Sequence, residues 1–89
     1  MEPKITRYRN GDNVITSVEY FINGELHRED GPAIINYNEE GEVTGERYYL
    51  NDIPIEKSLI TELGIPDDYH QWNDEHKLMF QFHALSKVE

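Results

Sequence analysis

From Ile5 to Ile55 the chain alternates short runs of β-branched and aromatic residues with pairs of turn-forming residues. This pattern is typical of antiparallel hairpins, and no helical periodicity accompanies it. The runs predict strands over residues 5–9, 14–22, 25–27, 33–38 and 42–50, with a further short run at 53–55. Pro54 restricts that last run to an edge of the sheet, because proline lacks the N–H that a second neighbouring strand needs. We therefore expect an antiparallel meander of about five strands.

Turn-forming pairs separate these runs at Asn10-Gly11, Asn23-Gly24, Asp30-Gly31, Glu40-Gly41 and Asn51-Asp52. Two-residue hairpin turns require a positive φ, which Gly, Asn and Asp adopt more readily than other residues. We therefore expect the chain to reverse at each of these pairs.

The hairpin region also repeats itself weakly. Tyr8, Asn10-Gly11 and Glu19-Tyr20-Phe21 are echoed by Tyr37, Glu40-Gly41 and Arg47-Tyr48-Tyr49, at a spacing of about 28–30 residues. Strand alternation places Tyr20, Ile22, Tyr48 and Leu50 on one face of the sheet. Two units of this kind would leave an apolar face that another element has to cover.

After residue 56 the pattern becomes helical. Leu59, Ile60 and Leu63 before Gly64 predict a short helix that starts near Glu56 and ends at the glycine, with a new turn at Pro66-Asp67-Asp68. Asn73 or Asp74 is a suitable N-cap for a last helix, whose apolar stripe is expected to be Leu78, Met79, Phe82 and Leu85. The predicted fold is therefore α+β: one domain over residues 1–89, with hairpin repeats over 5–56 and a helical segment over 57–89 packed on the sheet.

The most distinctive segment is His27-Arg28-Glu29-Asp30-Gly31-Pro32-Ala33. Asp30-Gly31 can form the turn, Pro32 removes a backbone donor, and Arg28 can reach Asp30 or Glu29 to close the loop. This reading gives a structural role to His27, Arg28, Asp30, Gly31 and Pro32.

Together with the preceding Tyr20-Phe21-Ile22-Asn23-Gly24-Glu25-Leu26, this segment resembles the MORN-like hairpin repeats of phage and giant-virus proteins. The resemblance covers residues 20–37, and a second copy at 48–56 lacks both the His-Arg pair and the Asp-Gly-Pro turn. It implies a viral origin and a scaffold whose known roles are mostly protein binding.

The chain is strongly acidic, with a net charge of −10 over 89 residues. Direct binding to nucleic acid or anionic lipid is disfavoured, because both depend on Lys and Arg meeting phosphates, whereas a cationic protein surface is favoured. The acids that would make this contact are Glu39, Glu40, Glu42, Glu46, Asp67 and Asp68. A simpler interpretation is that these acids only keep the protein soluble.

The expected location is the cytoplasm. The sequence contains no Cys, its first residues include no apolar run of signal-peptide length, and no run of about 18 apolar residues could span a membrane.

Candidate chemistry is sparse, so we expect neither an enzyme nor a metal or cofactor site. His76 and His83 share a helix face but lie about 10.5 Å apart, too far to bind one ion together. The carboxylate pairs lie mostly in predicted turns, where nothing would separate their pKa values for acid–base catalysis. No Cys nucleophile, phosphate-binding glycine loop or nucleophile elbow is present.

Three aromatic residues are candidate anchors for a partner, namely Phe21, Tyr49 and Trp72, since Trp and Tyr are enriched at binding hot spots. A simpler interpretation is a two-sided sheet with one face under the helix and the other partly solvated.

The leading hypothesis is a phage-type protein that binds and inhibits or redirects a host protein. That host protein would have a basic surface and handle nucleic acid, and charge mimicry would act as in anti-CRISPR and anti-restriction proteins. The alternatives are a structural module that self-associates into a homo-oligomer through a sheet edge, or an antitoxin-like neutraliser of a partner toxin.

Overall fold

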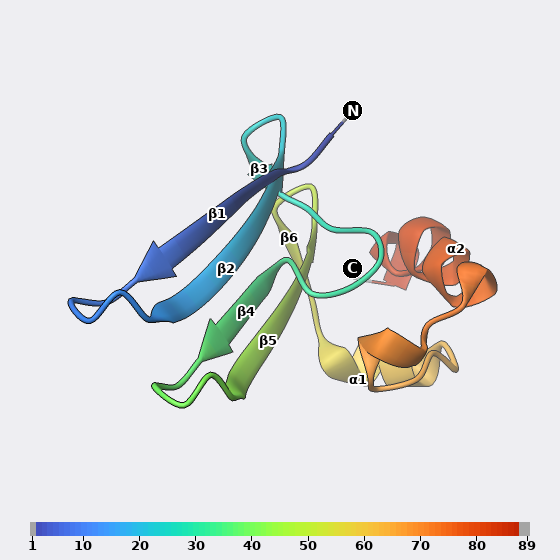
Figure 1. The fold of residues 1–89 in the computed structure, drawn as a ribbon. Helices are drawn as coiled ribbons and strands as arrows, with labels where there is room; N and C mark the ends of the chain where they lie inside the picture. Colours follow the sequence, from blue (N-terminus) through green and yellow to red (C-terminus); the bar gives the residue numbers. More distant parts are fainter. Residues whose placement is uncertain (1, 88–89) are drawn as a thin grey trace.

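The computed structural model describes residues 2–87 and has an α+β fold, with an antiparallel sheet followed by a helical segment (Figure 1). The strands are β1 (Lys4–Arg9), β2 (Ile15–Ile22), β3 (Glu25–Leu26), β4 (Ile34–Tyr37), β5 (Val43–Leu50) and β6 (Ile53–Ile55). The helices are α1 (Lys57–Glu62), η1 (Tyr69–Gln71), α2 (Asp74–His83) and η2 (Leu85–Lys87). Every strand lies within one residue of its predicted bounds.

The strand order is β1-β2-β4-β5-β6, with β3 paired to the end of β2 on the side that β4 occupies further along. β6 pairs with β5 alone, so Pro54 lies in an edge strand as predicted. The sheet therefore has two outer strands, β1 and β6.

Two of the predicted turns have the expected backbone. Asn23 and Gly24 have φ values of 55° and 79°, and Asn51 and Asp52 have φ values of 51° and 68°. Both central residues of each turn are thus left-handed, as a type I′ hairpin turn requires. The chain also reverses at Asn10-Gly11, between β1 and β2, but the positive φ expected of the glycine is absent there and at Asp30-Gly31.

The two longer hairpin loops share one construction. The Asn10 side-chain oxygen accepts hydrogen bonds from the N–H groups of Asp12 and Val14, at 2.9 and 3.1 Å. The Asn38 oxygen accepts from Glu40 and Glu42, at 3.0 and 2.9 Å. Such side-chain bonds to the following backbone let Asn form the turn without a glycine beside it.

The positive φ then falls three residues after each asparagine, at Asn13 (63°) in one loop and Gly41 (83°) in the other. Asn38 and Gly41 each lie 28 positions after their counterparts Asn10 and Asn13. The repeat is therefore regular at 28 residues, and the predicted match of Asn10-Gly11 with Glu40-Gly41 is two residues out of register.

Each repeat unit contains three strands, β1-β2-β3 in the first unit and β4-β5-β6 in the second. The units are joined where β4 pairs with β2, through Ser17↔Asn36, Val18↔Ile35 and Glu19↔Ile34. Where the first unit continues into the 27–33 loop, the second continues into α1.

The hydrophobic core lies at the second unit, where the helical segment packs on β5 and β6 (Figure 1). Tyr48, Trp72 and Phe80 form an aromatic cluster with ring centroids 5.1–5.9 Å apart. The helices thus cover only part of the sheet, since the hairpin ends of β1-β2 and β4-β5 extend away from them (Figure 1).

The predicted apolar stripe of the last helix is half right: Met79 and Leu85 pack against the core, but Leu78 and Phe82 do not. Leu78 and Phe82 are 52% and 69% exposed, whereas Phe80 and Ala84 are fully buried. Phe80 completes the aromatic cluster, and the small side chain of Ala84 one turn later lets the helix approach the core closely.

The predicted end of α1 at Gly64 is confirmed. Gly64 has a φ of 80°, its N–H bonds to the Thr61 carbonyl, and the Ile65 N–H bonds to the Ile60 carbonyl. This is a Schellman motif, in which a left-handed residue lets the last carbonyls of the helix find donors. It directs Ile65 into the same core as Ile60.

Candidate functional site

The 27–33 loop holds Arg28 between two aromatic rings. The Arg28 guanidinium carbon lies 4.1 Å from the Tyr20 ring centre and 5.1 Å from that of Tyr69. Its Nε donates to Asp30 Oδ1 at 2.8 Å, and its Nη1 donates to the Pro32 carbonyl at 3.2 Å. Arg28 therefore links the first repeat unit to the helical segment, and its contacts are those of a structural residue.

His27, Gly31 and Pro32 also face the protein interior. The Asn51 N–H donates to His27 Nδ1 and His27 Nε2 lies 2.9 Å from Glu29 Oε2, so the bonding fits the tautomer protonated at Nε2. A Cβ on Gly31 would lie 2.7 Å from Cδ2 of Tyr69, and Pro32 is almost fully buried. These residues of the 27–33 loop are thus held by contacts within the protein.

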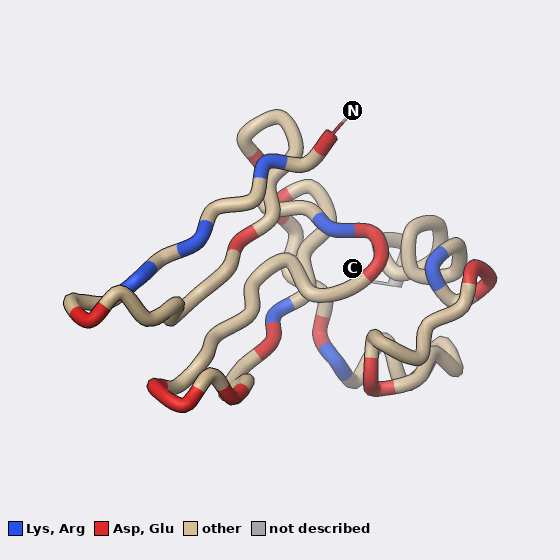
Figure 2. The backbone as a smooth tube through the Cα atoms, in the orientation of Figure 1, with Lys and Arg blue, Asp and Glu red and all other residues tan. Residues whose placement is uncertain are grey.

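Three of the candidate acids, Glu39, Glu40 and Glu42, form the exposed turn between β4 and β5, here called the acidic turn (Figure 2). Glu42 accepts a hydrogen bond from the Asn38 side chain at 2.9 Å. Within residues 2–87 no Lys, Arg or His forms an ion pair with this turn. Its negative charge is therefore compensated only by solvent and ions.

The remaining candidate acids lie apart from the acidic turn. Glu46 is on β5, 3.8 Å from Lys57 Nζ, and Asp67 accepts a hydrogen bond from Thr61 Oγ1 at 3.0 Å. Asp68 caps η1 by accepting the His70 N–H, and this bond, together with the His70 side chain, lowers the pKa of the Asp68 carboxyl. Asp67 and Asp68 thus have structural partners, and the six acids do not form one patch.

The proposed aromatic anchors differ in exposure. Trp72 is only 6% exposed, and its indole N–H donates to the Pro66 carbonyl at 2.8 Å. The interpretation of Trp72 as a partner anchor is therefore wrong, because it is a core residue. Phe21 and Tyr49 are partly exposed and, by strand alternation, face away from the side of the sheet that carries Tyr48.

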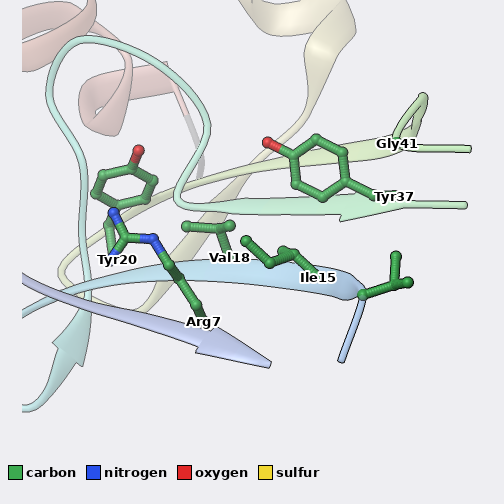
Figure 3. A pocket seen from close by; sticks show the side chains of 7 residues that line it. Arg7, Ile15, Val18, Tyr20, Tyr37 and Gly41 are labelled. Carbon is green, nitrogen blue, oxygen red and sulfur yellow. The ribbon is translucent and has the colours of Figure 1, made fainter. Parts of the chain in front are cut away.

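A feature that the sequence analysis missed is an open groove on the first unit and the start of the second. It has a volume of about 460 Å³ and is lined by Arg7, Val14, Ile15, Val18, Tyr20, Tyr37 and Gly41. Figure 3 shows Tyr20 and Tyr37 on either side, with Val18 and Ile15 between them. We call it the sheet groove, and at Gly41 it adjoins the acidic turn.

Alternation in the sequence indicates which face carries the sheet groove, but not that the groove is left open. Tyr20 and Ile22 are on the same face as Tyr48 and Leu50, and the helical segment packs on the core around Tyr48 and Leu50. The groove lies on the part of that face formed by the first unit and the start of the second.

Two further properties concern the described part of the chain. No group of three or more His, Cys, Asp or Glu side chains in residues 2–87 is arranged to hold a metal ion. None of the helices in these residues has the length and apolar character needed to cross a membrane.

Comparisons with known protein families, with curated proteins and with solved structures found no match to this chain. Its function has to be inferred from its own residues.

Proposed function

We propose that this protein is a binding module whose acidic turn and adjoining sheet groove bind a cationic surface of another protein. The observation that carries the proposal is their contact at Gly41, which places uncompensated carboxylates next to an apolar and aromatic hollow. Lys and Arg side chains have a charged head on an apolar stem, so a surface of this composition suits them. Tyr37 offers a ring face to the same cations, whereas the Tyr20 ring already carries Arg28.

The partner that this chemistry favours is a host protein that binds nucleic acid. Such proteins carry clustered Lys and Arg for phosphate contacts, and an acidic turn competes for them by charge. The resemblance of residues 20–37 to phage MORN-like hairpins supports a viral protein that acts inside a host cell. Inhibition or redirection of the host protein follows if the acidic turn occupies its phosphate-binding surface.

Affinity capture from a bacterial lysate tests this proposal. Tagged protein is incubated with the lysate, eluted with rising salt, and the released proteins are identified by mass spectrometry. We expect a nucleic-acid-binding protein to be released at moderate salt. At 0.1 M salt, screening limits the range of attraction between charges to about 10 Å. The captured protein is then titrated with the purified wild type and variants.

The decisive variant is the double substitution Glu39→Lys, Glu40→Lys, which reverses the charge of the acidic turn at two exposed positions. We expect it to weaken binding roughly tenfold or more, mainly through slower association. The double substitution Glu62→Lys, Glu75→Lys is the matched control, because it makes the same charge change at two exposed acids outside the acidic turn and the groove. Equal binding by the Glu39→Lys, Glu40→Lys variant and the wild type would contradict the proposal.

A further inference from the structure

Two strands form the junction between the repeat units. At each open edge of the sheet, the counterpart of one of these strands is present without a partner strand. β4, the first strand of the second unit, pairs with β2, the second strand of the first unit. The first strand of the first unit is β1, and its outer side has no strand neighbour in residues 2–87. Beyond β4, β5 pairs with β6 only over Tyr48–Leu50, so residues 43–47 have no second strand neighbour within the same range.

Both unpaired edges direct backbone hydrogen-bonding groups outward. Tyr20 donates its N–H to Ala33 and accepts from the His27 N–H, so alternate residues of β2, including Val18, face β4. By the 28-residue repeat, Glu46 is the counterpart of Val18, and Arg7 is the counterpart of Ile35. The backbone groups of Glu46 therefore point away from β4, and those of Arg7 point away from β2.

One row of side chains across the sheet has opposite charges at its two ends. Arg7, Val18, Ile35 and Glu46 stand in one row across the sheet, because each is paired with the next. This row begins with the exposed cation Arg7 and ends with the carboxylate of Glu46. β1 also carries Lys4 and Arg9, which are exposed (Figure 2).

We propose that a second copy of this chain adds its β1 to the open edge of β5, repeating the β2–β4 junction between molecules. The 28-residue repeat then sets the register: Arg7 of one copy lies opposite Glu46 of the other, Tyr8 opposite Gly45 and Thr6 opposite Arg47. Directly opposite residues share a sheet face, so the Arg7 guanidinium meets the Glu46 carboxylate. In this antiparallel arrangement Arg9 points toward the acidic turn, near Glu42.

The receiving edge adjoins a surface hollow. This hollow has a volume of about 240 Å³ and is lined by residues that include Glu46, Arg47, Glu56 and Lys57. Lys57, whose side chain is 53% exposed, is the present partner of Glu46 at 3.8 Å. The Lys57 end of this pair is exposed and the pair is long, so it is weak, and Arg7 of an incoming copy can replace Lys57.

The contact is head-to-tail, so a pair of copies keeps one free β1 edge and one free β5 edge for further copies. Such a heterologous contact gives an open chain unless the rotation between copies closes a ring. The inference goes beyond the proposed function, because it concerns the purified protein without any partner.

Charge exchange between Arg7 and Glu46 tests the register. Sedimentation velocity of the purified wild type is expected to show a mass that rises with concentration and falls with added salt. Arg7→Glu and Glu46→Arg each place like charges opposite one another and should raise the dissociation constant roughly tenfold. An equal mixture of the two variants should assemble again, because every interface in an alternating chain then joins opposite charges.

The double variant Arg7→Glu, Glu46→Arg should likewise assemble by itself. Glu25→Arg makes the same charge change as Glu46→Arg but lies on β3, so it should behave as the wild type. Circular dichroism of each variant checks that it is folded. A wild type that stays monomeric at millimolar concentration would overturn the inference, and so would a mixture of folded single variants that fails to assemble. A monomeric protein that still binds the cationic partner would leave the proposed function intact.

Discussion

At the scale of single residues, Tyr48 combines deep burial with an unsatisfied polar group. It is 3% exposed, and its hydroxyl has no hydrogen-bond partner in the described residues. Its ring packs against Trp72 and Phe80. The ring therefore stabilises the core while the hydroxyl works against it, since a buried polar group without a partner costs about 1–3 kcal/mol.

Tyr48→Phe should increase the free energy of unfolding by about 1–3 kcal/mol at neutral pH, because it removes the hydroxyl and keeps the ring. Burial raises the pKa of Tyr48 well above its ordinary value of 10.0. Above pH 10 the unfolded wild type loses this proton while the folded state keeps it, so wild-type stability falls as pH rises.

The advantage of Tyr48→Phe should therefore grow above pH 10, and urea unfolding on both sides of that pH measures it. A Phe variant that is less stable than the wild type would show that the hydroxyl has a partner in solution.

Gly31 is required by close packing and not by its backbone angle. A Cβ at this position would lie 2.7 Å from Tyr69 Cδ2, whereas a Cβ on Gly11 would meet no atom within 4 Å. Gly31→Ala should therefore lower the free energy of unfolding by about 1–3 kcal/mol. Gly11→Ala is the matched control and should be neutral or slightly stabilising. Thermal unfolding compares the two, and equal effects would contradict the packing argument.

At the scale of elements, the two long hairpin loops are interchangeable in construction. Asn13 and Gly41 occupy the same left-handed position of the repeat, with φ values of 63° and 83°. Gly41→Asn should therefore change stability by less than about 0.5 kcal/mol, because Asn tolerates this conformation. Gly41→Val should cost about 1–2 kcal/mol or more, because a β-branched side chain does not.

Chemical denaturation of these two Gly41 variants, beside the wild type, measures the difference. If both substitutions cost the same, the loop would not use the left-handed residue that the repeat assigns to it.

Local patterns predicted the elements of this fold better than they predicted its contacts. Strand bounds and the end of α1 at Gly64 depend on neighbours in sequence, and these predictions are confirmed. The loop at Asn10 was misjudged because its side chain, and not Gly11, supports the turn.

Burial is set by contacts between distant segments, and there the sequence was less informative. Trp72 was a candidate anchor for a partner, but it is buried and its ring stacks on that of Tyr48 in β5. The sheet groove was missed because its existence depends on how far the helical segment reaches. The acidic turn could be predicted, since acids in a hairpin turn have no core to enter.

At the scale of the whole molecule, packing is uneven along the length of the protein, which measures 41 × 26 × 24 Å. The helices lie at one end, and the tips of both hairpins lie at the other (Figure 1). All residues of β1 except Thr6 are exposed, whereas Tyr48, Leu50 and Ile55 of the second unit are buried in the core. The first unit is attached through the β2–β4 pairs, through hydrogen bonds of Leu26 and His27 with the Asn51-Asp52 turn, and through Arg28.

This asymmetry predicts graded hydrogen exchange. Amides of β5, β6 and α2 should exchange slowest, through global unfolding, and those of β1 should exchange faster by local opening of an edge strand. Arg28→Ala should widen this difference, because it removes the contacts of Arg28 with Tyr20 and Tyr69 that join the first unit to the helical segment. Arg7→Ala on the same unit is the control, and exchange is measured on dilute protein to avoid assembly. If Arg28→Ala accelerated all amides equally, the molecule would unfold as one cooperative unit and the first unit would not open separately.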